Sequence, residues 1–213
     1  NPEAIEMLHD MADAVRTHGA DLAMGFDGDG DRCGIVDDRG EEIFADRMGL
    51  MLARHWAAAF PGAKFVVDVK STGLFLSDPV LRDAGVTTEY WKTGHSHMKR
   101  RVRDTGALVG FEKSGHYFLA TPIGRGYDCG MRVAVEVARM LDAHPGQRLS
   151  DIEAAMPKAW TSPTMSPRCA DGEKYDVVSR IVADLDARAL ASGRAITRHS
   201  PLATCTPQAT FST

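Results

Sequence analysis

Three aspartates alternate with glycines at residues 27–32, which read Asp-Gly-Asp-Gly-Asp-Arg. Alternate residues of an extended or looped backbone can turn toward a common point. The carboxylates of Asp27, Asp29 and Asp31 can therefore converge on one divalent cation, and oxygen ligands suit Mg²⁺ above all. Arg32 adds a planar guanidinium that fits a phosphate oxygen. A metal and an arginine beside a phosphate are typical of phosphoryl transfer.

Two other readings of this stretch are a turn and a calcium loop. A single Asp-Gly pair is a common hairpin turn, but a triple alternation that ends in arginine is much rarer. A helix–loop–helix calcium site needs glycine at its sixth position and glutamate at its twelfth. Those positions hold Arg32 and Asp38, and the flanking residues 22–26 and 33–36 resemble strands. The sequence therefore favours magnesium over calcium.

Two further polar loops follow predicted strands. Residues 68–73 read Asp-Val-Lys-Ser-Thr-Gly, and they place Lys70 at the carboxyl end of a strand, where ligands bind in open parallel sheets. Residues 91–96 read Trp-Lys-Thr-Gly-His-Ser and open a helix, whose N-terminal amides attract anions. Thr93, Gly94 and His95 are the candidate ligands there. The alternative is that Thr93 or Ser96 simply caps the helix.

A third loop, residues 110–116, carries a carboxylate, a hydroxyl and an imidazole. Glu112 and Ser114 alternate, so both can reach one ligand, and this pair of groups can bind two sugar hydroxyls. Imidazole groups have an ordinary pKa of about 6.5, which makes His116 a candidate for general acid–base catalysis. A surface hairpin is the alternative. Residues 124–130 form only a weak candidate phosphate loop, in which we expect Asp128 to cap the next helix.

Strands that alternate with helices must position these loops. Hydrophobic periodicity and turn signals predict helices at residues 4–18, 45–60, 73–84, 95–104, 129–144, 149–155 and 172–190, and strands at 21–26, 33–37, 64–69, 86–91, 107–111 and 116–119. This order indicates an α/β fold with a mixed, mostly parallel sheet and flanking helices, preceded by a partial α/β domain.

Composition narrows the function classes. The chain has 213 residues, 44% of them hydrophobic, and a net charge of −4, which gives no reason to expect a nucleic-acid partner. The basic run at 99–103 could be a nucleic-acid or localisation patch, but a solvated helix face fits the acidic whole better. No apolar run has membrane-spanning length. The four cysteines are far apart and predict free thiols in the cytoplasm.

Four loops carry a resemblance to a known family, at residues 25–32, 68–73, 91–96 and 110–116. In their order and spacing over residues 1–190, they resemble the α-D-phosphohexomutases, specifically the bacterial phosphomannomutase/phosphoglucomutase branch. The resemblance implies a four-domain enzyme that moves phosphate between the 1- and 6-positions of a hexose, through a phosphoserine and a hexose 1,6-bisphosphate. It implies Mg²⁺ on Asp27, Asp29 and Asp31, and Arg32 near the phosphoryl group. Glu112 and Ser114 would bind sugar hydroxyls, while Lys70, His95 and His116 would line the cleft.

The resemblance also assigns parts of the chain to domains. Residues 1–42 resemble the second half of domain two, 43–157 domain three, and 158–193 a linker and the start of domain four. Residues 194–213 do not resemble the family, and we expect disorder there. The chain opens on Asn1 and contains neither the family's serine loop nor its phosphate-clamping loop. We therefore expect a fragment that is inactive alone. Cys129 stands where many members have an acidic residue.

Other function classes remain open at this level. The chain could be a non-catalytic module that binds sugar phosphate or metal, or a relative of the phosphoglucosamine mutases. An α/β phosphatase with an aspartate nucleophile at a strand end is a third class, which would release phosphate without a phosphoserine.

Overall fold

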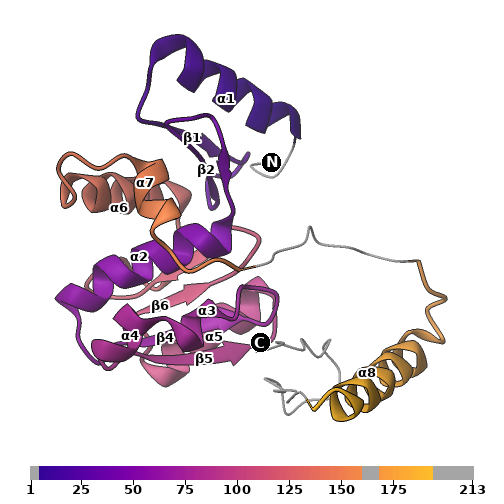
Figure 1. Ribbon diagram of the computed structural model, residues 1–213. Helices are drawn as coiled ribbons and strands as arrows, with labels where there is room; N and C mark the ends of the chain where they lie inside the picture. Colours follow the sequence, from indigo (N-terminus) through magenta and orange to yellow (C-terminus); the bar gives the residue numbers. More distant parts are fainter. Residues whose placement is uncertain (1–4, 160–167, 194–213) are drawn as a thin grey trace.

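The computed structural model describes residues 5–159 and 168–193, and its N-terminal part is a small antiparallel sheet. Strands β1 (Leu22–Phe26), β2 (Cys33–Asp37) and β3 (Glu42–Ile43) lie in that order, with both pairs antiparallel. Helix α1 (Ile5–His18) packs on this sheet through a cluster that includes Val15 and Val36 (Figure 1). The aspartate loop connects β1 to β2.

A second sheet of five strands follows, in the order β5-β4-β6-β7-β8. Strand β4 pairs in parallel with β5 and β6, whereas β7 is antiparallel to both β6 and β8. Four strands therefore run in one direction and β7 opposes them, which confirms the predicted mixed, mostly parallel α/β class. The strands are β4 (Lys64–Asp68), β5 (Thr87–Trp91), β6 (Val109–Phe111), β7 (Tyr117–Leu119) and β8 (Tyr127–Asp128).

Helices cover both faces of this sheet because its strands are apolar on both sides. Phe65 of β4 belongs to the main core cluster, which also holds the buried side chains of α2 (Ala45–Ala59). Val66, the next residue of β4, points to the opposite face and packs with Met98 of α5 (His95–Thr105). Successive side chains of a strand point to opposite faces, so one strand supports two helix layers.

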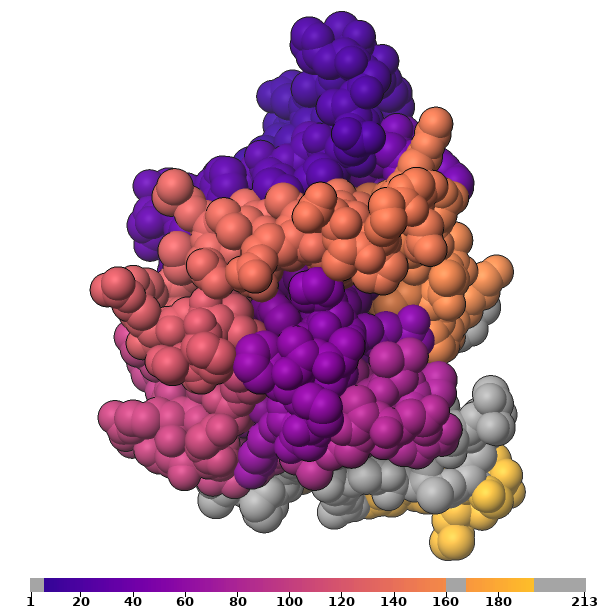
Figure 2. Space-filling view, turned by 90° about the vertical axis from the view of Figure 1, so that its left-hand side faces the viewer, coloured from indigo at the N-terminus to yellow at the C-terminus, as the bar shows by residue number. Residues whose placement is uncertain are grey.

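Helices α6 (Gly130–Asp142) and α7 (Leu149–Ala154) join the two sheets. They lie between the N-terminal sheet and α2 in both views (Figures 1 and 2). Cys33 and Ile35 of β2 belong to the same core cluster as α2 and α6. Arg47 of α2 also forms an ion pair with Glu153 of α7 at 2.6 Å. The aspartate loop is therefore held against the second sheet by a shared core.

The predicted helix at residues 73–84 is two short helices in the structure. Helix α3 (Leu74–Ser77) ends before Asp78, and α4 (Pro79–Asp83) begins directly after it. Asp78 adopts an extended conformation, and its side chain accepts hydrogen bonds from the amides of Val80 and Leu81. The residue before a proline avoids helical geometry, and proline suits the first helical position. These two effects divide the segment.

The last helix, α8 (Lys174–Ala191), corresponds to the helix predicted at residues 172–190, and it has no buried apolar face. Ala189 is its one buried residue, while Tyr175, Ile181 and Leu190 are more than half exposed. The predicted disordered tail at 194–213, and residues 160–167 of the proline-rich linker, lie outside the described residues. No helix in the described ranges combines the length and the apolar character that a membrane crossing requires.

Phe111 is central to the main core, and its replacement tests this packing. Its ring is fully buried and lies 5.1–6.3 Å from the rings of Phe65, Phe75, Tyr117 and Trp56. Phe111→Ala should lower the free energy of unfolding by about 3–5 kcal/mol in urea titrations, because it leaves a cavity that its neighbours cannot fill. Phe26→Ala, at a position that is 39% exposed, is the control and should cost under about 1 kcal/mol. Similar losses for both variants would contradict this account of the core.

Candidate active site

The buried carboxylate of Asp68 joins three loops at the carboxyl end of β4. Asp68 is fully buried, and its Oδ1 accepts hydrogen bonds from the amide and hydroxyl of Ser71, at 3.0 and 2.6 Å. The same oxygen accepts from the amide of Lys113 at 3.3 Å, while Oδ2 accepts from the Thr93 hydroxyl at 3.0 Å. Each donor belongs to a different predicted polar loop. One carboxylate therefore fixes all three loops relative to each other.

A second contact joins two of these loops directly. Glu112 is 2% exposed, and its Oε1 accepts a hydrogen bond from the backbone amide of Gly94 at 2.6 Å. Gly94 has a φ of +128°, which favours glycine, and this conformation starts α5. Burial raises the pKa of Glu112, and nearby Asp68 adds to the rise, although the Gly94 amide opposes it. Neither Thr93 nor Ser96 caps α5, since the N-cap residue is Gly94.

The aspartate loop brings its three carboxylates together, as predicted. Asp27, Asp29 and Asp31 each offer an oxygen, and these oxygens lie within 4.8 Å of one another. Arg32 turns back onto the same loop, where its Nε donates to Asp27 Oδ2 at 2.5 Å and its backbone amide donates to Asp27 Oδ1 at 3.2 Å. Of the three carboxylates, the guanidinium thus pairs most closely with that of Asp27.

The oxygens of Asp31 lie 3.9 Å from Arg32 Nε and 3.5 Å from His116 Nδ1, so its ion-pair contacts are long. Burial raises its pKa, as do the neighbouring charges of Asp27, Asp128 and Asp29, with His116 opposing the rise. Burial also acts to raise the pKa of Asp27, but the hydrogen bonds and charge of Arg32 outweigh it and lower that pKa. Asp31 Oδ1 is buried and has no hydrogen-bond partner among the described residues. An all-oxygen donor set with a buried oxygen that accepts no hydrogen bond fits a hard divalent cation.

Two histidines meet at Asp128, which we had expected to cap a helix. The prediction was wrong: Asp128 lies in β8, and Cys129 occupies the N-cap position of α6. Asp128 Oδ2 lies 2.7 Å from His116 Nδ1, and its Oδ1 lies 3.0 Å from His95 Nε2. Its side chain is only 5% exposed. One buried carboxylate therefore orients both imidazoles.

His116 also connects the two sheets. Its Nδ1 lies 3.5 Å from Asp31 Oδ2 of the aspartate loop, and its backbone forms an isolated antiparallel bridge with Arg32. The start of α6 reinforces this junction, because the Gly130 amide donates to the Gly30 carbonyl at 2.9 Å. A Cβ at Gly130 would lie 2.5 Å from the Arg32 carbonyl oxygen. The aspartate loop can approach this closely only because residue 130 is glycine.

The other predicted site residues are Ser114 and Lys70. Ser114 is half-buried and Lys70 is exposed, each in its predicted loop. Within the described part of the chain, Lys70 forms no hydrogen bond or ion pair. The structure thus brings the three aspartates, Arg32, His95 and His116 into one cluster. Thr93, Gly94 and Glu112 lie beside this cluster, in loops that Asp68 holds together. Lys70 remains apart from these contacts.

The raised pKa of Glu112 predicts a pH-dependent effect on stability. An acid whose pKa is higher in the folded chain destabilises that chain once it ionises. The penalty is absent below its ordinary pKa of 4.5 and grows as the pH rises through and above that value. Glu112→Gln keeps an acceptor for Gly94 and should raise the free energy of unfolding at pH 7 by on the order of 1 kcal/mol.

Thermal unfolding at pH 7 and near pH 4 checks this prediction. The difference between variant and parent should shrink at the acidic pH. Glu6→Gln, at an exposed position of α1, is the control and should change little at either pH. A destabilised Glu112→Gln variant at pH 7 would contradict the assignment.

Comparison with known proteins gives the family. A family model described as phosphoglucomutase/phosphomannomutase, alpha/beta/alpha domain III, matches residues 44–159, and the corresponding domain II model matches residues 1–40. A phosphomannomutase/phosphoglucomutase from Pseudomonas putida is 32% identical over 186 residues, which are 87% of this chain and 39% of the relative. A phosphoglucomutase from Neisseria gonorrhoeae is also 32% identical, over 86% of this chain and 39% of that protein.

A solved structure agrees with these matches. A phosphoglucomutase/phosphomannomutase family protein from Burkholderia thailandensis has a TM-score of 0.67 and 32% identity, with 76% of this chain and 34% of that chain covered. The chain spans about two fifths of the length of the curated relatives that it matches. The matched domain III model alone covers more than half of the chain. The chain therefore belongs to the phosphoglucomutase/phosphomannomutase family.

Proposed function

We propose that this chain is the metal-binding and sugar-binding part of a phosphohexomutase. The complete enzyme would interconvert hexose 1-phosphate and hexose 6-phosphate, with mannose or glucose as the sugar, through a phosphoserine and a hexose 1,6-bisphosphate. The observation that carries the proposal is the position of His116, between Asp31 of the aspartate loop and Asp128 of β8. An acid–base group thereby adjoins a cation site, and phosphoryl transfer needs both.

The aspartate loop would hold Mg²⁺ through Asp27, Asp29 and Asp31. Its oxygen donors support this assignment, as does Asp31 Oδ1, which accepts no hydrogen bond from the described residues. A bound Mg²⁺ would neutralise charge that develops on the transferring phosphoryl group. Arg32, whose Nε donates to Asp27, would contact the same phosphoryl group.

The loops joined by Asp68 would bind and orient the sugar. Glu112 Oε1 is occupied by the Gly94 amide, so Oε2 would accept from one sugar hydroxyl while Ser114 binds a second. Lys70, at the exposed rim, would pair with a phosphate. His95 would stand beside His116, which would take the proton of the attacking hydroxyl. Asp128 would keep both rings in place during this transfer.

The phosphatase hypothesis fits the geometry less well. It needs an aspartate nucleophile at a strand end, and Asp68 holds that place in β4. Asp68 is fully buried, and both of its oxygens accept hydrogen bonds from the chain. A carboxylate in that setting cannot attack a phosphorus atom without breaking the loop contacts, so we favour the mutase.

A chimaera tests the proposed function. Residues 5–159 would replace the matching segment of the Pseudomonas putida relative, whose other parts supply what this chain does not span. The chimaera should convert hexose 1-phosphate to hexose 6-phosphate in a coupled assay. The Asp29→Asn/Asp31→Asn variant should lose at least about a hundredfold in kcat/KM, because two of three metal ligands lose their charge.

The unmodified relative is the positive control, and circular dichroism confirms that each chimaera is folded. A folded chimaera that binds hexose phosphate without converting it would point to the non-catalytic module instead. Equal activity in the double variant would remove the aspartate loop from the mechanism.

The same chimaera tests Asp128 as a positioning residue. Asp128→Asn should lower kcat by about a hundredfold and leave KM nearly unchanged, since Asp128 faces the imidazoles and not the sugar. Nitrogen-15 NMR of the histidine rings should report altered tautomers for both residues. Asp142→Asn, the same change at an exposed position of α6, is the control. Unchanged ring spectra in Asp128→Asn would contradict the role, whatever its effect on the rate.

A further inference from the structure

The basic run of α5 divides between two environments. Arg101 packs over the ring of Trp91, with its Cζ 4.2 Å from the ring centroid, and it forms an ion pair with Glu89. Lys99, Arg100 and Arg103 face the other way and line a groove of about 680 Å³. A solvated helix face was the favoured interpretation of this run. Of the three side chains, only Arg103 has an acidic partner among the described residues, the exposed Asp104, which lies outside the groove's lining.

Arg125 completes the groove from the opposite side. The loop that follows β7 supplies Arg125, and the helix and this loop enclose a floor that includes the buried Val102 and Ala107. No acidic residue lines the groove. In the described part of the chain, Lys99, Arg100 and Arg125 form no ion pair with any carboxylate. Their charges are therefore concentrated on a concave surface of a chain whose net charge is −4.

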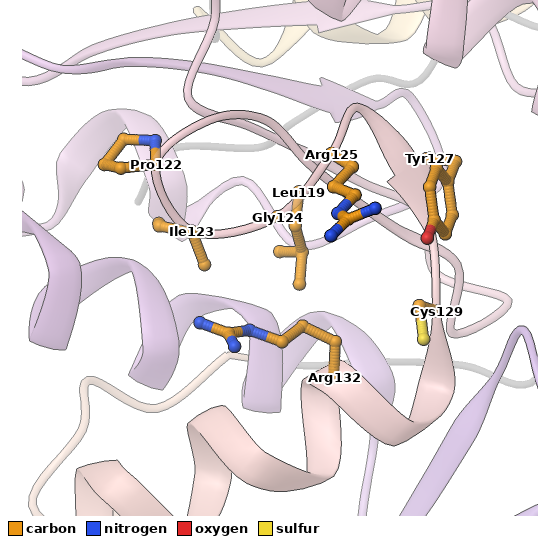
Figure 3. A pocket seen from close by; sticks show the side chains of 8 residues that line it. All are labelled: Leu119, Pro122, Ile123, Gly124, Arg125, Tyr127, Cys129 and Arg132. Atoms are coloured by element: carbon orange, nitrogen blue, oxygen red, sulfur yellow. The ribbon is translucent and has the colours of Figure 1, made fainter.

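The neighbouring pocket differs in its charge. It has a volume of about 300 Å³ and shares Arg125 with the groove, while Arg132 of α6 lies on its far side (Figure 3). Arg132 pairs with Glu136 at 2.7 Å, so its charge is already compensated. Leu119, Pro122 and Ile123 supply much of the remaining lining. The larger groove therefore carries more uncompensated positive charge than the pocket, because Lys99 and Arg100 line it in addition to the shared Arg125.

One end of the groove reaches the candidate active site. His95 lines this end, and its Nε2 contacts Asp128. Concave surfaces of one charge sign focus the field and raise the local concentration of an oppositely charged ligand. Guanidinium and ammonium groups together fit phosphoryl oxygens, and the groove's volume falls in the usual range for small-molecule sites.

We propose that this groove is an anion site that captures the phosphoryl group of a small phosphate ester beside the active site. Its cations would hold the ester before the sugar reaches His95 and the loops joined by Asp68. The identification of the ester as a hexose phosphate rests on the proposed function. The anion site itself does not depend on that function. A nucleic-acid strand fits the groove less well, because the cations gather in one hollow and the chain is acidic overall.

Titration of the 213-residue chain with glucose 1-phosphate and with inorganic pyrophosphate, followed by amide NMR at constant ionic strength, tests the proposal. Both probes should produce saturable shifts at Lys99, Arg100 and Gly126. The Lys99→Glu/Arg100→Glu variant should weaken binding at least about tenfold, because two charge-assisted contacts are lost. Arg82→Glu/Arg188→Glu makes the same charge change at exposed positions of α4 and α8 and should stay within about twofold of the parent.

Several results would overturn the anion site. They are an absence of saturable shifts, equal weakening in both charge variants, and tighter binding of a single-stranded oligonucleotide than of pyrophosphate. If Lys99→Glu/Arg100→Glu fails to fold, Arg125→Gln on the exposed loop provides the same test with a smaller expected loss. The Asp29→Asn/Asp31→Asn chain should still bind pyrophosphate in the groove. The groove and the proposed metal-dependent function can therefore fail separately.

Discussion

The candidate site depends on one buried charge, the carboxylate of Asp68. Removal of a carboxylate from water is costly unless hydrogen bonds replace its hydration. Here the replacement donors come from three different loops, through Ser71, Thr93 and Lys113. None of these loops can move without leaving part of that charge unsatisfied. The requirement to solvate one acid therefore sets the relative positions of the loops that carry Lys70, His95 and Glu112.

A second constraint places the aspartate loop against this assembly. The loop belongs to the small sheet, but Cys33 and Ile35 behind it pack into the core of the larger one. Gly130 then permits close approach of α6, and His116 bridges to Asp31. Apolar packing thus brings the two sheets together, and polar contacts fix their position relative to each other. The site is built at the junction of two units, neither of which carries all of its groups.

Local patterns predicted most elements and the four polar loops, because periodicity and turn residues are local signals. They did not predict Asp128, whose role follows from strand pairing. Asp128 lies opposite Phe118 in the ladder of β7 and β8, and His116 precedes Phe118 by two residues. That short pairing, which brings Asp128 beside His116, has no signal in the sequence around Asp128. Asp68 was quoted within its loop, but the partners that give it importance lie 25 and 45 residues away.

The acids that the fold buries are not fully compensated by the chain itself. Burial raises the pKa of Glu112, of Asp31 and of Asp46, and Asp46 Oδ1 has no hydrogen-bond partner among the described residues. A fold optimised for stability alone would pair or replace such groups, since each unsatisfied charge weakens the native state. These acids gather at one end of the sheet, beside a groove in which Lys99, Arg100 and Arg125 have no acidic partner among the described residues. Such an arrangement is expected where bound charged ligands balance the charges of the protein. The same imbalance that costs stability would provide binding energy for the cation and the phosphate ester that we propose.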